Sequence, residues 1–159
     1  MERKRNIRVK VNGVNYEQDV EIRKTLAEYL REDLGLRGTH LGCEHGVCGA
    51  CTILFDGASA RSCITYAVQS DGAEIMTVEG MARMGVVLHP IQEAFREHHG
   101  LQCGFCTPGF LITAFELLRD SQSLSADEIR EQISGNLCRC TGYQGIVEAI
   151  QTADGKWKR

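Results

Sequence analysis

The residues of this chain best suited to do chemistry are its eight cysteines, which fall into two sets of four. The first set has the spacing Cys43-x4-Cys48-x2-Cys51-x11-Cys63. This spacing matches the C-x4-C-x2-C…C pattern of plant-type [2Fe–2S] ferredoxins. Glycines stand beside or between the first three cysteines, and they allow a loop to wrap closely around an anionic group with its N–H groups pointing inward. We therefore predict a [2Fe–2S] site that uses these four thiolates.

Two other metal-site chemistries are weaker interpretations of the first set. A structural zinc site also takes four thiolates, but usually from two short C-x2–4-C pairs, whereas three ligands here crowd into the nine residues 43–51. His45 lies inside the loop and could replace a thiolate, as in Rieske centres. With four cysteines available, we expect His45 beside the site or at the surface. Disulfides are disfavoured because the charged N-terminus has no signal-peptide pattern.

The second set consists of Cys103-x2-Cys106 and Cys138-x-Cys140, and each pair immediately precedes a predicted helix. Two helix N-termini would then converge on one place, where unpaired N–H groups and partial positive charge favour an anion and thiolate ligands. The first pair alone could be a thioredoxin-like redox motif. That interpretation leaves the second pair unexplained, so we predict one four-ligand site.

The N-terminal half must position the first set, and its pattern indicates mixed sheet and helix. Apolar residues alternate on both sides of Asn12-Gly13, the strongest short hairpin signal. A second hairpin is predicted around Asp56-Gly57, which would place Cys63 on a strand. The expected strands cover 7–11, 14–16, 51–55, 58–63 and 74–78, and the expected helix covers 25–34.

From about residue 80 the apolar period becomes helical, and we predict four helices. They begin at Pro90, at Thr107-Pro108, at Ser125 and at Thr141. The last two starts have the pattern of a capping box, in which a hydroxyl and a side chain three residues later bond each other's backbone N–H groups. The predicted class is therefore α+β, with one domain over 1–80 and another over 81–159.

Composition excludes several kinds of partner. Of 159 residues, 43% are hydrophobic and 25% charged, as in ordinary globular proteins. The net charge of −3 gives no sign of a nucleic-acid partner. No apolar run approaches the ~20 residues of a membrane span, so we expect a cytoplasmic protein. No nucleophile elbow, phosphate loop or dinucleotide fingerprint is present, and we predict no catalytic residue in this chain.

Three segments carry a family resemblance: residues 42–52, 102–109 and 135–143. They resemble the cluster motifs of the iron–sulfur subunits of molybdenum hydroxylases. This family includes xanthine dehydrogenase, aldehyde oxidoreductase, aerobic carbon monoxide dehydrogenase, and nicotinate or quinoline hydroxylases. The resemblance covers roughly residues 6 to 153, and no cysteine departs from it.

The resemblance implies a β-grasp ferredoxin-like domain followed by a four-helix [2Fe–2S] domain with approximate two-fold symmetry. It also implies two partners: a large subunit that holds molybdopterin and a medium subunit that holds FAD. The cluster held by Cys103, Cys106, Cys138 and Cys140 would lie nearest the pterin. The cluster held by Cys43, Cys48, Cys51 and Cys63 would lie further along, towards the flavin.

By the same resemblance, Gln102 would hydrogen-bond the pterin, and Cys140 would lie close to its edge. A plainer role for Gln102 is to pack at a helix start. The implied function is electron transfer from molybdopterin through two [2Fe–2S] clusters to FAD or another acceptor. A free-standing electron carrier is the alternative, but single-cluster ferredoxins need only the first half.

Overall fold

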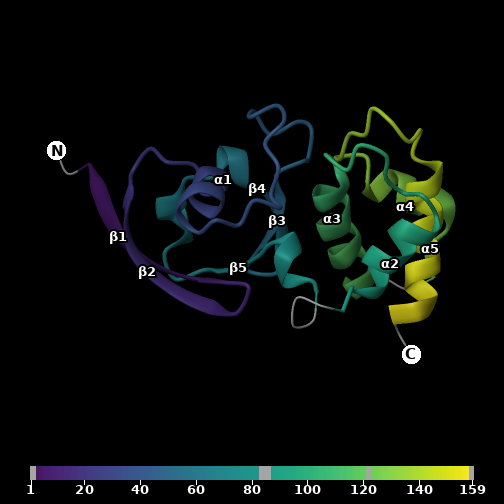
Figure 1. Ribbon diagram of the computed structural model, residues 1–159, viewed down its shortest axis with the longest axis horizontal. Helices are drawn as coiled ribbons and strands as arrows, with labels where there is room; N and C mark the ends of the chain where they lie inside the picture. The colour runs from purple at the N-terminus through teal and green to yellow at the C-terminus, as the bar shows by residue number, and fades with distance from the viewer. Residues whose placement is uncertain (1–2, 83–86, 121–122, 158–159) are drawn as a thin grey trace.

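A computed structural model describes residues 3–82, 87–120 and 123–157, with no side chain described for residue 157. Its N-terminal half contains a five-stranded mixed sheet (Figure 1). Strands β1 (Lys4–Val11) and β2 (Val14–Glu21) pair antiparallel along their whole length. Between them Asn12 and Gly13 have φ of 50° and 84°, the left-handed turn that Asn-Gly favours. The first predicted hairpin is confirmed.

The remaining strands are β3 (Thr52–Phe55), β4 (Ala58–Arg61) and β5 (Glu74–Met76), in the sheet order β2-β1-β5-β3-β4. Strand β5 pairs parallel with β1 and antiparallel with β3. It ends before Val78 because Asn12 takes over the pairing. The Asn12 side chain accepts from Thr77 N–H at 2.9 Å and donates to its Oγ1 at 2.9 Å.

One strand prediction is wrong at the first set. Strand β4 ends at Arg61, and Cys63 lies in the 3-10 turn Ser62–Ile64 rather than on a strand. The cause is Ser62, which bonds the Cys51 carbonyl twice, through its backbone N–H at 3.3 Å and its hydroxyl at 2.7 Å. This double contact turns the chain out of the ladder and brings Cys63 back towards Cys51.

The predicted helix of the first half packs across the sheet, as a β-grasp fold requires. It begins as α1 (Leu26–Glu28) and continues as a π-helical turn over Tyr29–Asp33. Its start is fixed by a capping box, in which the Thr25 hydroxyl accepts from Glu28 N–H at 3.2 Å. Leu26 and Leu30 are fully buried against the sheet. The α+β class and the β-grasp expectation are confirmed.

The sheet also contacts the helical half, because successive residues of a strand point to opposite faces. Ile53 in β3 packs in the core shared with α1, whereas its neighbour Leu54 packs in the core of the helical half. In β5, Ile75 likewise packs in the core shared with α1, and Met76 packs against the core of the helical half. The sheet therefore lies between α1 and the helices of the second half.

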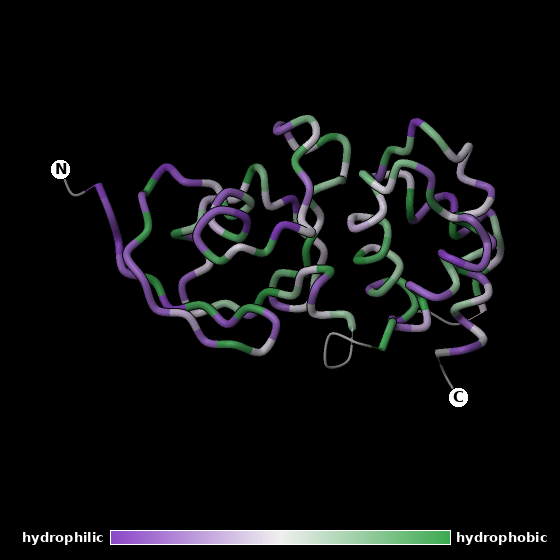
Figure 2. The backbone as a smooth tube through the Cα atoms, in the orientation of Figure 1, coloured by the Kyte–Doolittle hydropathy of each residue, from purple (hydrophilic) through white to green (hydrophobic). Residues whose placement is uncertain are grey.

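The second half contains the four predicted helices: α2 (Pro90–Glu97), α3 (Thr107–Asp120), α4 (Ala126–Gln132) and α5 (Gln144–Trp157). Helix α3 runs beside the sheet and buries Phe110 and Ile112 completely. In Figure 2 it is largely green and white, whereas the outer side of this half carries more purple. None of the described helices combines the length and the apolar character needed to cross a membrane.

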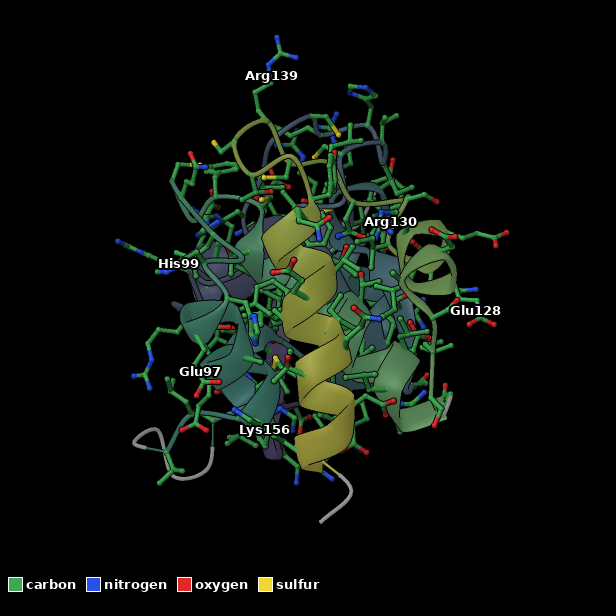
Figure 3. The ribbon with its side chains drawn as sticks, turned by 90° about the vertical axis from the view of Figure 1, so that its right-hand side faces the viewer. Glu97, His99, Glu128, Arg130, Arg139 and Lys156 are labelled. Atoms are coloured by element: carbon green, nitrogen blue, oxygen red, sulfur yellow. The ribbon has the colours of Figure 1, made fainter. Side chains whose placement is uncertain are left out.

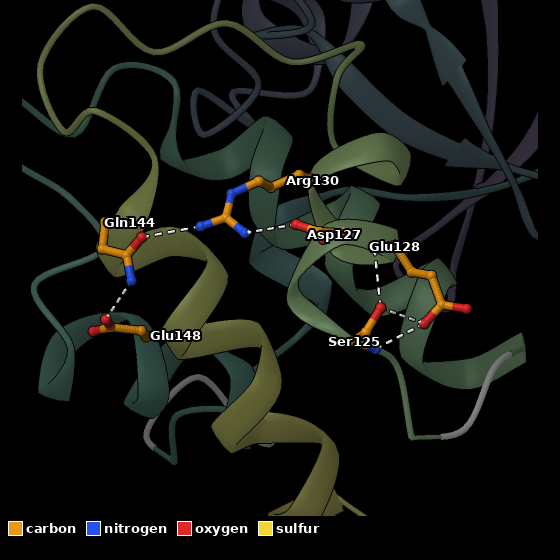
Figure 4. Close-up of polar contacts among 6 residues, drawn as sticks. All are labelled: Ser125, Asp127, Glu128, Arg130, Gln144 and Glu148. Carbon is orange, nitrogen blue, oxygen red and sulfur yellow. Dashed lines mark hydrogen bonds and ion pairs between the residues drawn. The ribbon is translucent and has the colours of Figure 1, made fainter.

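The predicted capping box of α4 is confirmed (Figure 4). The Ser125 hydroxyl accepts from Glu128 N–H at 3.3 Å, and the Glu128 carboxylate accepts from Ser125 N–H at 2.8 Å. Further along α4, Arg130 donates to Asp127 at 3.3 Å and to Gln144 at 3.0 Å. Arg130 therefore connects α4 to the first turn of α5.

The predicted capping box at Thr141 is wrong, because α5 begins three residues later, at Gln144. Two other groups occupy the Thr141 hydroxyl: it accepts from Tyr143 N–H at 3.2 Å and donates to the Cys138 sulfur at 3.1 Å. The Gln144 amide donates to Glu148 at 2.7 Å instead of reaching back. A contact with a cysteine thus replaces the helix cap.

Candidate metal centres

All eight cysteines are free thiols, and the first set contains two contacting pairs. Cys48 N–H donates to the Cys43 sulfur at 3.3 Å, and the Cys51 side chain lies close enough to Cys63 to raise the pKa of its thiol. The loop before β3 carries Cys43 and Cys48, and the turn after β4 carries Cys63. In Figure 1 the loop before β3 lies along the upper edge of the molecule, and so does the loop before α5.

Two glycines of the first loop cannot be replaced without strain. Gly46 and Gly49 have φ of 86° and 76°, values that a residue with a side chain rarely adopts. A Cβ on Gly49 would lie 2.6 Å from the carbonyl oxygen of Gly135. The glycines predicted to let the loop wrap a cluster therefore also let it approach the second half of the chain.

The thiols of the first set differ in acidity. Backbone N–H groups of His45 and Cys48 point at the Cys43 sulfur and lower the pKa of this thiol to about 6. Burial, followed by the Cys51 thiol, raises the pKa of Cys63 to about 11. A bound metal ion deprotonates a coordinating thiol outright, so Cys63 would become a thiolate only when it is a ligand.

His45 lies at the surface with its ring directed at the backbone. Its Nδ1 is 2.5 Å from the carbonyl oxygen of Cys43, and the residue is exposed. This is the surface position expected for it, rather than that of a ring replacing a thiolate.

The second set also contains two contacting pairs. The Cys140 and Cys103 sulfurs are 3.6 Å apart, and the Cys106 and Cys138 thiols hydrogen-bond to each other. Cys103 and Cys106 lie just before α3, and Cys138 and Cys140 lie in the loop before α5. Cys103 and Cys140 are exposed, whereas Cys106 and Cys138 are half-buried. The second set therefore has one pair at the surface and one beneath it.

Polar groups of the α5 loop are aimed at Cys138. Burial alone would raise the pKa of this thiol, but bonds from the Thr141 hydroxyl at 3.1 Å and its N–H at 3.4 Å lower it. The Tyr143 hydroxyl accepts from Cys138 N–H at 3.0 Å. By contrast, burial and the neighbouring Cys138 raise the pKa of Cys106 to about 12. Sequence reasoning missed these contacts.

Both sets have the donors that a [2Fe–2S] group needs. Among the described residues, no three His, Cys, Asp or Glu side chains converge as ligands of a single ion would. The thiols meet instead as pairs, two in each set, and a binuclear cluster takes two protein ligands on each of its irons. At the second set the Thr107 hydroxyl, beside Cys106, is buried and has no hydrogen-bond partner in the described part of the chain. A sulfide of a bound cluster would supply an acceptor at such a position.

The segments that carry the two sets are in contact across the halves of the chain. Leu137, which precedes Cys138, donates its N–H to the carbonyl of Cys48 at 2.9 Å. His40 stacks on Phe105 with ring centroids 4.9 Å apart, and its Nδ1 lies 2.7 Å from the Phe105 carbonyl. A single hydrogen bond thus connects a residue next to a second-set cysteine with a first-set cysteine.

Exposed side chains gather around the second set: Leu101, Gln102, Phe105, Leu137 and Arg139. Figure 3 shows Arg139 projecting away from the body of the protein, above the N-terminal end of α5. Exposed apolar residues beside polar ones are typical of a contact site for another molecule. Gln102 is exposed and lies immediately before Cys103.

Two protein-family models match the chain. A model described as a 2Fe-2S iron-sulfur cluster binding domain matches residues 9–75. A model described as a [2Fe-2S] binding domain matches residues 77–151. Each matched range contains one set of four cysteines.

Curated relatives and solved structures agree with these matches. The chain is 57% identical over 150 residues to the nicotine 6-hydroxylase small subunit of Paenarthrobacter nicotinovorans, covering 94% of this chain and 90% of that one. It is 58% identical to caffeine dehydrogenase subunit gamma of a Pseudomonas species, over 92% of this chain and 89% of that one. Quinoline 2-oxidoreductase from Pseudomonas putida 86 contains a chain of similar structure, with a TM-score of 0.95, 50% identity, and coverage of 99% and 98%.

Proposed function

Since this chain belongs to the iron–sulfur subunits of the molybdenum hydroxylase family, we propose that it relays electrons from molybdopterin on a large partner subunit to FAD on a medium subunit, or to another acceptor. Family membership makes it a subunit that binds two [2Fe–2S] clusters and serves an oxidoreductase without being its catalytic part. Each cluster, when bound, accepts and donates one electron. The role of this chain is to hold the two clusters in place and set their potentials.

We assign the ligands set by set. Cys103, Cys106, Cys138 and Cys140 would hold the cluster nearest the pterin. Cys43, Cys48, Cys51 and Cys63 would hold the other cluster. The contacts within each set support a further division, in which each contacting pair shares one iron.

The order of the two clusters rests on exposure. The second set has two exposed thiols, Cys103 and Cys140, and exposed residues surround it. Gln102 is free to hydrogen-bond a pterin in a partner subunit, and Cys140 would lie closest to its edge. The first set ends in the buried thiols Cys51 and Cys63, so its cluster would be less accessible from that side.

The observation that carries the proposal is the hydrogen bond from Leu137 N–H to the Cys48 carbonyl, at 2.9 Å. It joins the peptide next to Cys138 to a residue of the other set. A relay needs its two centres close together and rigidly held, and this contact supplies a short bonded route between them.

The ligand assignment is tested by one substitution in each set. Cys106→Ser should remove one of two [2Fe–2S] signals in the EPR spectrum of the reduced complex, and Cys48→Ser should remove the other. Each variant should contain two irons per chain instead of four. A variant that retains both signals would overturn the assignment for that cysteine. Surface variants that keep all eight cysteines, such as Asn15→Asp, serve as controls for handling losses, because Asn15 is exposed and far from either set in the sequence.

The partners are tested by purification of the tagged protein from its native host. A large molybdenum-containing chain and a medium flavin-containing chain should be recovered with it in equal amounts. Recovery of the iron-loaded chain alone would favour the free-standing carrier.

We also propose a cytoplasmic location, which the eight free thiols support. We further propose a division into functional units at residues 1–80 and 81–159, whose outer limits lie beyond the described residues.

A further inference from the structure

Asn136 is a buried polar residue at the junction of the two halves, with 3% of its surface exposed. Its side-chain Nδ2 donates to the carbonyl of Gly49 at 3.1 Å and to Thr52 Oγ1 at 3.4 Å. Its Oδ1 accepts from the Thr113 hydroxyl at 3.0 Å. One amide therefore bonds the loop of the first set, strand β3 and helix α3 at the same time.

The residues on either side of Asn136 bond the N-terminal half as well. The Gly135 carbonyl accepts from Arg61 Nη2 at 2.7 Å. Leu137 N–H donates to the Cys48 carbonyl at 2.9 Å. Three consecutive residues are thus attached to the other half, and Cys138 follows directly.

Helix α3 packs closely against this amide. A Cβ on Gly109, in the first turn of α3, would lie 2.2 Å from the Gly49 carbonyl oxygen and 2.9 Å from Asn136 Nδ2. Helix α3 therefore presses on the same point from the other side. Because a buried donor or acceptor without a partner is costly, the amide is held in this one orientation.

We propose that Asn136 is a positioning residue that fixes the separation and orientation of the two cluster sites, and through them the transfer of electrons between the sites. It stands two residues before Cys138, and its partner Gly49 follows Cys48. A displacement of this amide would therefore move a ligand of each set. The inference rests on the proposed function, since it needs both sets to hold clusters.

The test replaces the side-chain N–H donor of Asn136 and keeps the size of the side chain. Asn136→Asp retains an acceptor for the Thr113 hydroxyl but turns a carboxylate oxygen towards the Gly49 carbonyl, which repels it. Asn15→Asp makes the same change at an exposed position. Thr113→Val removes the bond to α3 and leaves the bond between the halves intact.

The measurement is the EPR spectrum of the fully reduced complex, in which both clusters are paramagnetic and split each other's signals according to their distance and orientation. Iron content is determined on the same samples. We expect Asn136→Asp to keep four irons and both signals but to lose or change the mutual splitting. After rapid mixing with substrate, reduction of the cluster at the first set should be slower than in the wild type. The splitting should be unchanged in Asn15→Asp and Thr113→Val.

An unchanged splitting in a fully loaded Asn136→Asp protein would overturn the inference. If this variant does not load four irons, Asn136→Ser is measured in the same way, because it introduces no buried charge. An unchanged splitting in loaded Asn136→Ser also overturns it. A wild-type protein without two cluster signals would refute the proposed function and this inference together, whereas two signals with an Asn136-independent splitting would refute the inference alone.

Discussion

The hydroxyl of Thr141 is expected to raise the reduction potential of the cluster at the second set. It donates to the Cys138 sulfur at 3.1 Å, and the Thr141 N–H donates to the same sulfur at 3.4 Å. Hydrogen bonds to cluster sulfurs stabilise negative charge and are one of the determinants of potential. Thr141→Val removes the hydroxyl bond while preserving the shape of the side chain and the backbone N–H.

The size of the shift follows from the strength of that bond. A hydrogen bond to a charged group contributes about 1.5–3 kcal/mol. Only the difference in the strength of this bond between the oxidised and reduced states moves the potential. We take this difference as half of the middle of that range, which is about 1 kcal/mol. For one electron a tenfold change in equilibrium, about 1.4 kcal/mol, corresponds to about 59 mV. Because the reduced state is more negative and bonds more strongly, Thr141→Val should lower the potential by about 40 mV.

The assay is a redox titration of the complex monitored by the EPR signal that Cys106→Ser removes. Thr141→Ser keeps the hydroxyl and should restore the wild-type potential. Thr152→Val is the matched control, since the Thr152 hydroxyl contacts His98 at 2.8 Å and no cysteine. A potential that rises in Thr141→Val, or falls equally in Thr152→Val, would refute the reasoning.

Three further predictions concern stability, each measured by thermal or denaturant unfolding. Gly109→Ala should destabilise the protein by about 1–3 kcal/mol, because the added Cβ would meet the Gly49 carbonyl. Gly155→Ala should instead stabilise it by about 0.5–1 kcal/mol, because the space around Gly155 in α5 is open. Equal effects would contradict the packing described. Ser125→Ala should cost about 1 kcal/mol by removing the cap on Glu128 N–H, and no loss would show that the cap contributes nothing. Removing iron with a chelator and a reductant should lower the unfolding temperature, since metal binding is coupled to folding; an unchanged temperature would contradict this.

Features encoded by a few neighbouring residues could be predicted from the sequence. The spacing of the cysteines indicated two metal sites, Asn12-Gly13 indicated the first hairpin, and Ser125 with Glu128 indicated the start of α4. Each depends on a local conformation or a local bond, so no knowledge of the rest of the fold was needed.

Features that depend on distant parts of the chain could not be predicted. Cys63 leaves the strand because Ser62 bonds Cys51, eleven residues away. Thr141 is different, because the sulfur that competes for its hydroxyl belongs to Cys138, only three residues away, and the spacing of a capping box gives no sign of that competition. The bond from Asn136 to Gly49 spans 87 positions, and no periodicity or motif indicates which of many polar residues will form it.

The division of β3 between two cores has a consequence for dissecting this protein. Leu54 is buried only because helices from the other half cover it, and Met76 packs against the same helices. A fragment ending near residue 80 would present these side chains to water, and the complementary fragment would lose part of its own apolar cover. We therefore expect separately expressed halves to associate or aggregate, and the intact polypeptide to melt as one cooperative unit.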